Sequence, residues 1–242
     1  MSLIKRSKKE CAITICSIFV NPTQFNNPND LASYPDKLAD DLKKLEKTHC
    51  DIVYTPNIDD LYAKDEKAKK FDFGTLTSGM EGKFRPGHIN GVATIIEKFY
   101  KIITPTKAFY GQKDLQQLQI VKALAKQMKI STKTIGVPTD RESNGLAKSS
   151  RNILLSKNTK NDASLIYNCL SYCLNNKHQG ISALKTYIKN EFAKKKTLSL
   201  EYAEFVSLNS MMPIKKWGAE NENAICIAAY IDRVRLIDNI IL

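Results

Sequence analysis

The stretch Tyr110-Gly111-Gln112-Lys113-Asp114-Leu115-Gln116-Gln117 carries most of the structural information in this chain, because a short apolar run ends there and a helix begins. After Asp114 the apolar residues recur at a spacing of three or four, which is typical of an amphipathic helix. Gly111 lets the backbone approach a ligand closely, and Lys113 adds a compact positive charge. The N–H groups of a first helical turn also favour an anion. Gln116 and Gln117 can then donate and accept hydrogen bonds at the rim of the site. The junction predicts a phosphate site, although an ordinary strand-to-helix turn fits the same pattern.

A second polar loop, Gly145-Leu146-Ala147-Lys148-Ser149-Ser150-Arg151-Asn152, has the residue types that bind phosphate oxygens. Arg151 offers a planar fork of two parallel donors, and Ser149 and Ser150 supply short hydroxyl donors. Such a loop can surround a triphosphate. The alternative is a polar surface turn that caps the element after it.

Two further segments combine apolar elements with polar turns. Residues 15–25 form a β-branched and aromatic run that stops at Asn21-Pro22 and leaves Gln24 just beyond its end. Ligands of doubly wound sheets collect beyond the carboxyl ends of the strands. Residues 81–88 form a loop punctuated by glycine and proline that leads into an apolar helix, and such loops hold sites when a rigid scaffold positions them.

These four segments occur in one order, and together they resemble the signature segments of the pantothenate synthetases, the pantoate–β-alanine ligases. The resemblance runs from about Ser2 to Leu242. Its matched motifs are Val20 to Phe25, Tyr34-Pro35, Glu81-Gly82, Arg85 to His88, Gly111 to Gln117, Ser149 to Asn152 and Arg235 to Asn239. The family implies an α/β fold, with a Rossmann-like nucleotidyl-transferase domain (a parallel sheet with helices on both faces) that binds ATP and pantoate over residues 1–139. A smaller C-terminal α/β lid domain follows over residues 140–242.

The coarse pattern of the sequence agrees with this fold class. Strands are predicted at 13–20, 51–54, 107–110 and 132–137, with helices at 36–47, 91–103 and 115–128 between them. This alternation is expected of a parallel sheet. Residues 137–144 are the predicted hinge, because proline and polar residues interrupt the pattern there. Beyond it we predict helices at 162–175 and 181–194, then strands at 202–208, 224–231 and 233–238.

By resemblance, the chain is an ATP-dependent, AMP-forming ligase that joins D-pantoate to β-alanine through a pantoyl adenylate and releases pyrophosphate. Gln24 and Gln117 match the family's pantoate-binding glutamines, which argues against another nucleotidyl transferase of the same superfamily. The residues that match its ATP-binding segments are Gly111, Gln112, Lys113, Asp114, Asp140, Lys148, Ser149, Ser150 and Arg151. Lys113 and Arg151 are expected to be catalytic, because they can stabilise the charge that develops on the α-phosphate.

Magnesium is the expected cofactor, since Mg²⁺ commonly bridges nucleotide phosphates. Asp40 and Asp41 are candidate outer ligands, but we favour a solvated helix face for these two acids. No residue is assigned as a direct metal ligand. The family resemblance also implies a homodimer.

The chain departs from the family in three places. The family carries a strand and a His-x-Gly-His segment, with the proton donor, ahead of the helix that matches Ser2 to Lys9, and residues 1–242 contain neither. A start codon assigned too late, which we expect, or a truncated gene would explain this. Without that central strand we expect the chain to be marginally stable or prone to aggregate. Lys148 and Asp140 replace residues that the family usually has apolar, and an aspartate beside ATP could weaken binding.

These departures leave a second hypothesis open, a non-catalytic homologue that only binds ligand or a partner. His88 is the only histidine within a matched segment, and we interpret it as structural rather than as a replacement proton donor. In-frame codons upstream of Met1 that encode the strand and the His-x-Gly-His segment would favour the ligase.

The composition is compatible with the ligase and argues against proteins that bind nucleic acid or a membrane. The 37 Lys and Arg residues against 25 Asp and Glu give a net charge of +12, which would suit nucleic acid or an anionic membrane. The lysines are dispersed and no basic stripe with interleaved aromatic residues occurs, so neither partner is expected. No signal peptide or membrane-spanning stretch is predicted. The six cysteines lack a Cys-x-x-Cys pair, which predicts reduced thiols and a cytoplasmic protein.

Overall fold

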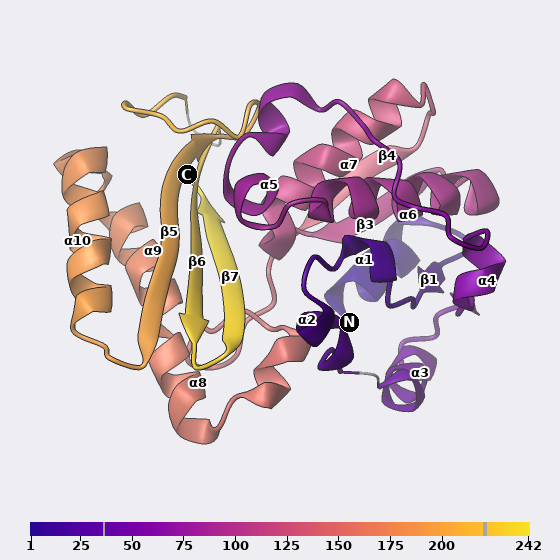
Figure 1. Ribbon diagram of the computed structural model, residues 1–242, viewed down its shortest axis with the longest axis horizontal. Helices are drawn as coiled ribbons and strands as arrows, with labels where there is room; N and C mark the ends of the chain where they lie inside the picture. Colours follow the sequence, from indigo (N-terminus) through magenta and orange to yellow (C-terminus); the bar gives the residue numbers. More distant parts are fainter. Residues whose placement is uncertain (36, 220–221) are drawn as a thin grey trace. The chain divides into compact units, whose positions relative to one another are not determined.

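The computed structural model describes residues 1–35, 37–219 and 222–242, and its contacts divide the chain into two compact units (Figure 1). The first unit contains Met1–Thr77, Glu81–Gly111 and Gln116–Val137. The second unit contains Pro138–Leu242 together with two short segments from earlier in the chain, Ser78–Met80 and Gln112–Leu115. The glycine–lysine junction at 110–117 therefore has residues in both units.

Helices and parallel strands alternate along the first part of the chain, as predicted. The elements are α1 (Ser2–Glu10), β1 (Ile15–Ser17), η1 (Pro22–Gln24), α2 (Pro28–Ala32), α3 (Leu38–Glu46), β2 (Ile52–Tyr54), α4 (Ile58–Leu61), η2 (Gly74–Thr77), α5 (Met80–Phe84), α6 (His88–Ile103), β3 (Lys107–Gly111), α7 (Leu115–Gln127) and β4 (Lys133–Val137). The start of the predicted helix at 36–47 lies outside the described residues, and α6 begins earlier than predicted because Gly87 turns the chain with a φ of +83°.

The parallel strands form two separate pairs rather than the one sheet that the sequence predicts. Within the described residues β1 pairs only with β2, and β3 pairs only with β4. The predicted strand at 13–20 is reduced to three residues in β1, and its flanks Ile13 and Val20 are 63% and 36% exposed. A strand paired on one edge alone has fewer hydrogen bonds and packing contacts to extend it.

Helices α6 and α7 cover β3 with apolar side chains. Tyr100 of α6 and Val121 and Ala125 of α7 are buried together against Ala108 and Tyr110 of β3. The spacing of the α7 residues is the helical periodicity from which this element was predicted. The packing fixes where β3 ends and where α7 begins, which positions the glycine–lysine junction between them.

The second unit is an antiparallel sheet with helices on it. Its elements are η3 (Gln112–Asp114), η4 (Ser150–Leu154), α8 (Lys157–Ala163), α9 (Leu165–Asn175), η5 (Lys177–Gln179), α10 (Ile181–Ala193), β5 (Leu198–Ser207), β6 (Asn223–Ile231) and β7 (Val234–Ile241). The strand order is β5-β6-β7, and α9 and α10 lie beside this sheet (Figure 1). Fully buried residues such as Phe205, Ile227 and Leu184 form its core. Strand β7 continues three residues past the predicted end at 238, so Asn239 lies within the sheet.

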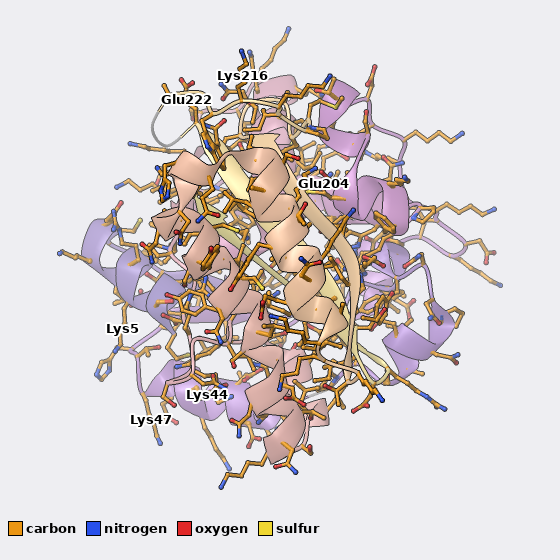
Figure 2. All side chains as sticks on the ribbon, turned by 90° about the vertical axis from the view of Figure 1, so that its left-hand side faces the viewer. Lys5, Lys44, Lys47, Glu204, Lys216 and Glu222 are labelled. Carbon is orange, nitrogen blue, oxygen red and sulfur yellow. The ribbon has the colours of Figure 1, made fainter. Side chains whose placement is uncertain are left out.

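The surface carries the positive charge at separate places, as predicted. The exposed side chains of Lys5, Lys47 and Lys216 extend outward from different segments of the chain (Figure 2). All six cysteines are free thiols. In the described ranges, no helix combines the length and the apolar character needed to cross a membrane.

The strand pairing predicts a difference in local stability that hydrogen exchange can measure. Amides of β6, which is paired on both edges and buried at every residue except Tyr230, are expected to exchange slowest. Amides of β1 are expected to exchange orders of magnitude faster, because this strand is short and paired on one edge. Equal protection of β1 and β6 would contradict the described pairing.

Candidate active site

In the first unit the turn η1 carries Gln24. This turn lies directly on the first turn of α6, where Gly91 faces it. A Cβ atom at Gly91 would lie 2.2 Å from the carbonyl oxygen of Thr23 and 2.6 Å from the Cα atom of Gln24. Only glycine therefore allows the backbone of η1 to approach α6 this closely.

Asn21, which is 1% exposed, holds this approach with its side chain. Its Nδ2 atom donates to the carbonyl oxygen of Gly91 at 3.1 Å. Its Oδ1 atom accepts from the hydroxyl of Tyr62 at 2.8 Å and from that of Thr23 at 3.0 Å. The sequence placed Asn21 at the end of a strand and within a matched motif, without a role; in the structure it fixes the turn that bears Gln24.

His88 is a second support of the same turn. Its Nδ1 atom lies 2.8 Å from the carbonyl oxygen of Gln24, and its Nε2 atom lies 3.1 Å from Nη1 of Arg85. A carbonyl oxygen only accepts and a guanidinium only donates, so these two bonds require the neutral ring with the proton on Nδ1. Both ring nitrogens are thus committed to neighbours, which supports the interpretation of His88 as a structural residue.

The two adjacent glutamines of α7 have different environments. Gln116 is 5% exposed; its Nε2 atom donates to the carbonyl oxygen of Leu76 at 2.7 Å, and its Oε1 atom accepts from the backbone N–H of Glu81 at 2.9 Å. Gln116 therefore ties α5 and η2 to α7 and does not serve at the rim of the site, contrary to the sequence interpretation. Gln117, the proposed pantoate ligand, is half-buried on the same helical turn.

The lysine junction continues in the second unit as the single turn η3. Gly111 ends β3 opposite Val137, and a Cβ atom at Gly111 would meet nothing within 4 Å. The position that a Gly111 side chain would take is thus free of other protein atoms. The Nζ atom of Lys113 lies 3.3 Å from Oδ1 of Asp114, and the Lys113 side chain is 19% exposed.

The second polar loop starts with a small hairpin. Arg141 and Ala147 form an antiparallel bridge, and the N–H of Lys148 donates to the carbonyl oxygen of Asp140 at 2.8 Å. At its tip Gly145 has a φ of +87°, and a Cβ atom there would lie 2.1 Å from the ring of Tyr167. The hairpin requires glycine at that position for both reasons.

The predicted phosphate ligands directly follow the hairpin, at the start of the turn η4. The Oγ atom of Ser149 accepts from the N–H of Arg151 at 3.2 Å and so caps the turn. Asn152 is buried and donates from Nδ2 to the carbonyl oxygen of Ala147 at 3.1 Å. The loop is thus held by its own side chains, and Ser150 and Arg151 are carried on a short, fixed turn.

A cluster that the sequence did not reveal lies next to both segments. Asp238 of β7 accepts two bonds from the guanidinium of Arg141, at 2.5 Å to Oδ2 and 3.1 Å to Oδ1. Burial raises the pKa of Asp238, while the hydrogen bond and charge of Arg141 oppose that rise. Asn239 donates from Nδ2 to the carbonyl oxygens of Gln112 and Lys113, each at 2.8 Å. The only sequence signal for these residues was the matched motif at 235–239.

The structure therefore distributes the predicted site residues as follows. The second unit contains Gln112, Lys113, Asp114, Asp140, Lys148, Ser149, Ser150 and Arg151, and the first unit contains Gln24, Gly111 and Gln117. Strand β7 contacts both η3 and η4. The turns η3 and η4, which carry five of these candidates, thus lie against the same strand.

The magnesium candidates lie on α3. The Oδ1 atom of Asp41 pairs with Nζ of Lys44 at 2.8 Å, with both side chains about half exposed, and Asp40 is exposed beside it. This environment is that of a solvated helix face. Across the described ranges, no group of three or more His, Cys, Asp or Glu side chains is arranged to hold a metal ion.

Parallel strand pairs with helices, an antiparallel second unit and a cationic polar loop are the features of an α/β protein with a candidate site for an anionic ligand. A family model described as Pantoate-beta-alanine ligase matches residues 1–241. The chain therefore belongs to the pantoate–β-alanine ligase family, whose members are ATP-dependent ligases. The resemblance seen in the sequence and the α/β fold class are both confirmed.

Curated relatives and solved structures agree with this assignment. The chain is 41% identical over 246 residues to the pantothenate synthetase of Christiangramia forsetii, covering 100% of this chain and 86% of the relative. It is 42% identical to that of Azobacteroides pseudotrichonymphae, covering 99% and 86%. The crystal structure of pantothenate synthetase from Thermus thermophilus matches with a TM-score of 0.93 at 30% identity, covering 99% of this chain and 87% of that one.

A further solved structure shows the ligands of a relative. The pantoate–β-alanine ligase of Francisella tularensis, described as complexed with beta-gamma ATP and β-alanine, matches with a TM-score of 0.80 at 35% identity. The match covers 99% of this chain and 83% of that chain.

The close approach at Gly91 predicts the effect of a single methyl group. Gly91→Ala is expected to push η1 away from α6 and to raise the KM for pantoate at least tenfold, because Gln24 moves with the turn. Gly79→Ala is the control, since a Cβ atom there meets nothing within 4 Å. Substrate-dependence of adenylate formation measures both variants, and equal KM values would contradict the role of the turn.

The bonding of His88 predicts which substitutions are tolerated. His88→Asn keeps an N–H donor toward the carbonyl oxygen of Gln24 and is expected to retain most activity. His88→Ala removes the donor to that partly buried carbonyl and is expected to lower the free energy of unfolding by about 1 kcal/mol. Denaturant unfolding gives the stability of both variants. Loss of all turnover in a folded His88→Asn protein would instead indicate a proton-transfer role.

Proposed function

We propose that this chain condenses D-pantoate with β-alanine in two steps at the expense of ATP. The pantoate carboxylate attacks the α-phosphate, which forms pantoyl adenylate and releases pyrophosphate. The amine of β-alanine then attacks the acyl carbon and releases AMP. The observation that carries the proposal is that η3 and η4, with their cationic and hydroxyl side chains, contact the same strand β7.

The charge that develops in the first step determines the roles of Lys113 and Arg151. A pentavalent α-phosphate gains negative charge as pantoate attacks, and fixed cations and donors at that point lower the barrier by about 3 kcal/mol each. Lys113 now pairs with Asp114 at 3.3 Å, a contact that its partly exposed side chain can exchange for a phosphate oxygen. Arg151 supplies the bidentate fork, and Ser149 and Ser150 add hydroxyl donors.

Gln24 and Gln117 are the proposed ligands of pantoate. Pantoate offers hydroxyl groups and a carboxylate, and a primary amide both donates and accepts hydrogen bonds. The buried bonds from Asn21 and His88 to the backbone around η1 support a rigid placement of Gln24. Rigid placement of the acceptor acid is what an attack on phosphorus requires.

Magnesium fits this site as a companion of the nucleotide. Mg²⁺ is commonly held by phosphate oxygens and water with one or two carboxylates, which is compatible with described residues that form no cluster of His, Cys, Asp or Glu ligands. When bound, it would neutralise charge on the leaving pyrophosphate. Asp114 follows Lys113 directly in sequence, and Asp140 and Glu142 precede the serine–arginine loop.

The remaining assignments rest on the family resemblance. They are a homodimer, an ATP- and pantoate-binding Rossmann-like domain over residues 1–139 and a lid over residues 140–242. The composition, rather than the resemblance, is the ground for a cytoplasmic protein without a nucleic-acid or membrane partner. The division of the chain after Val137 supports a boundary near that of the proposed domains.

A non-catalytic homologue that binds only ligand or a partner is the second candidate function. One observation favours it: both ring nitrogens of His88 are committed to neighbours, so the only histidine in a matched segment does not fill the proton-donor role. Family membership and a relative complexed with a nucleotide favour the ligase.

Pantoate-dependent exchange of pyrophosphate into ATP separates the two candidates. The ligase predicts exchange by the 242-residue chain, and Lys113→Ala is expected to reduce kcat about 10²-fold. Lys126→Ala is the matched control, because Lys126 is an exposed lysine in the last turn of α7. A folded wild-type chain that binds ATP without any exchange would establish the non-catalytic homologue.

A further inference from the structure

Two neighbouring polar residues on β7 have no role in the reaction proposed above. Asp238 and Asn239 are 4% and 6% exposed, although β7 is the last strand of its described sheet. Burial of a carboxylate or an amide is costly unless each polar atom has a partner. The partners of these two residues therefore indicate what the pair does.

Asn239 bonds to the backbone of the lysine turn. Its Nδ2 atom lies 2.8 Å from the carbonyl oxygen of Gln112 and 2.8 Å from that of Lys113. A primary amide has two N–H donors, so this one side chain satisfies both carbonyls. Two consecutive fixed carbonyls set the orientation of the peptide between them, and with it the direction in which the Lys113 side chain leaves the backbone.

Asp238 bonds to the hairpin that leads into the serine–arginine loop. Its two carboxylate oxygens accept from both terminal nitrogens of Arg141. The same guanidinium donates to the carbonyl oxygen of Gly145 at 3.1 Å and lies 4.1 Å above the ring of Tyr167. Arg141 is thus held on three sides, and it fixes the hairpin whose next residues are the proposed phosphate ligands.

The two halves of the pair are joined to each other. The backbone N–H of Asn239 donates to Oδ1 of Asp238 at 2.8 Å, and the carbonyl oxygen of Asn239 accepts from Nη2 of Arg141 at 3.4 Å. Consecutive strand residues point to opposite sides of the strand, which lets one residue reach η3 while the other reaches the hairpin. A displacement of either segment is thus transmitted to the other through two adjacent residues.

A purely stabilising role accounts poorly for the ion pair. Burial raises the pKa of Asp238, while the hydrogen bond and charge of Arg141 and, more weakly, the charge of Lys113 act to lower it. Buried ion pairs contribute little net stability compared with well-packed apolar residues. This arrangement instead fixes two geometries. One is the bidentate pair of Arg141 with Asp238, and the other is the pair of hydrogen bonds from the Asn239 amide.

We propose that Asp238 and Asn239 are positioning residues that set the lysine turn η3 and the serine–arginine loop at the spacing that one nucleotide requires. The inference deepens the proposed function and rests on it, since it assumes that these two segments bind the same ATP. Neither residue is assigned a contact with substrate; Asn239 acts through Lys113, and Asp238 acts through Arg141.

The first test replaces the double donor. Asn239→Ala is expected to speed hydrogen exchange in the peptide that contains Gln112–Asp114 and to lower kcat/KM for ATP roughly tenfold, because both bonds to the turn are lost. The KM for pantoate is expected to stay within about twofold of wild type, a split that a general loss of structure would not produce. Asn239→Ser keeps one donor, and its kcat/KM for ATP is expected to lie between those of wild type and Asn239→Ala. It replaces the alanine variant if that variant does not fold.

Asn223 provides the matched control. It is a buried asparagine on β6 of the same sheet, 4% exposed, and its amide also donates to a backbone carbonyl, that of Ala219 at 3.2 Å. Asn223→Ala is expected to lower the unfolding midpoint without a change in the exchange of Gln112–Asp114 or in kcat/KM for ATP. Equal effects of Asn223→Ala and Asn239→Ala on these two quantities would overturn the proposal.

The second test uses the ion pair. Asp238→Asn and Arg141→Lys are each expected to lower kcat/KM for ATP. The kcat/KM of the double variant is expected to be no lower than that of the worse single variant, because both substitutions remove the same interaction. Fully additive losses would refute coupling through this pair. Hydrogen exchange needs no turnover. A chain that does not exchange pyrophosphate into ATP would therefore refute the proposed function, while the hydrogen-exchange protection of η3 would still decide the positioning claim.

Discussion

The rest of the candidate site depends on the hydrogen bonds of one buried group, the side-chain amide of Asn239. It holds two carbonyls of a turn that lies 126 and 127 residues earlier in the chain. The neighbouring carboxylate of Asp238 holds Arg141 and its hairpin. Because an amide offers two N–H donors and a carboxylate two acceptor oxygens, two consecutive residues are enough to fix two separate backbones.

The first unit uses the same physical device with other residues. Asn21 donates to the carbonyl oxygen of Gly91, and His88 donates to that of Gln24. In both units a buried side-chain donor satisfies a main-chain carbonyl of a predicted binding segment, and an unpaired buried carbonyl would cost about 1–3 kcal/mol. Binding loops that lack regular hydrogen bonds are thereby made rigid, which catalysis by charge placement requires.

Local sequence patterns predicted the elements with strong periodicity, such as α7 and β6, and the segments that carry the polar residues. The last residues predicted for α6, α7 and β6 lie within one residue of the observed ends, whereas the bounds of β1 and the end of β7 differ more. Strand β1 is shorter than its apolar run because it is paired on one edge, and β7 extends to Ile241 because β6 pairs with it throughout. The assignment of Gln116 to the rim failed because its partners, at Leu76 and Glu81, are distant in sequence. Tertiary hydrogen bonds of this kind leave no spacing signal.

The account is tested most directly by a crystal structure of the chain with a non-hydrolysable ATP analogue. We predict that the phosphates lie within hydrogen-bond distance of both the Lys113 ammonium and the Arg151 guanidinium, while the Asn239 amide stays bonded to the carbonyls of Gln112 and Lys113. A nucleotide that contacts only one of the two segments, or a lysine turn that releases Asn239 when the nucleotide binds, would contradict the account.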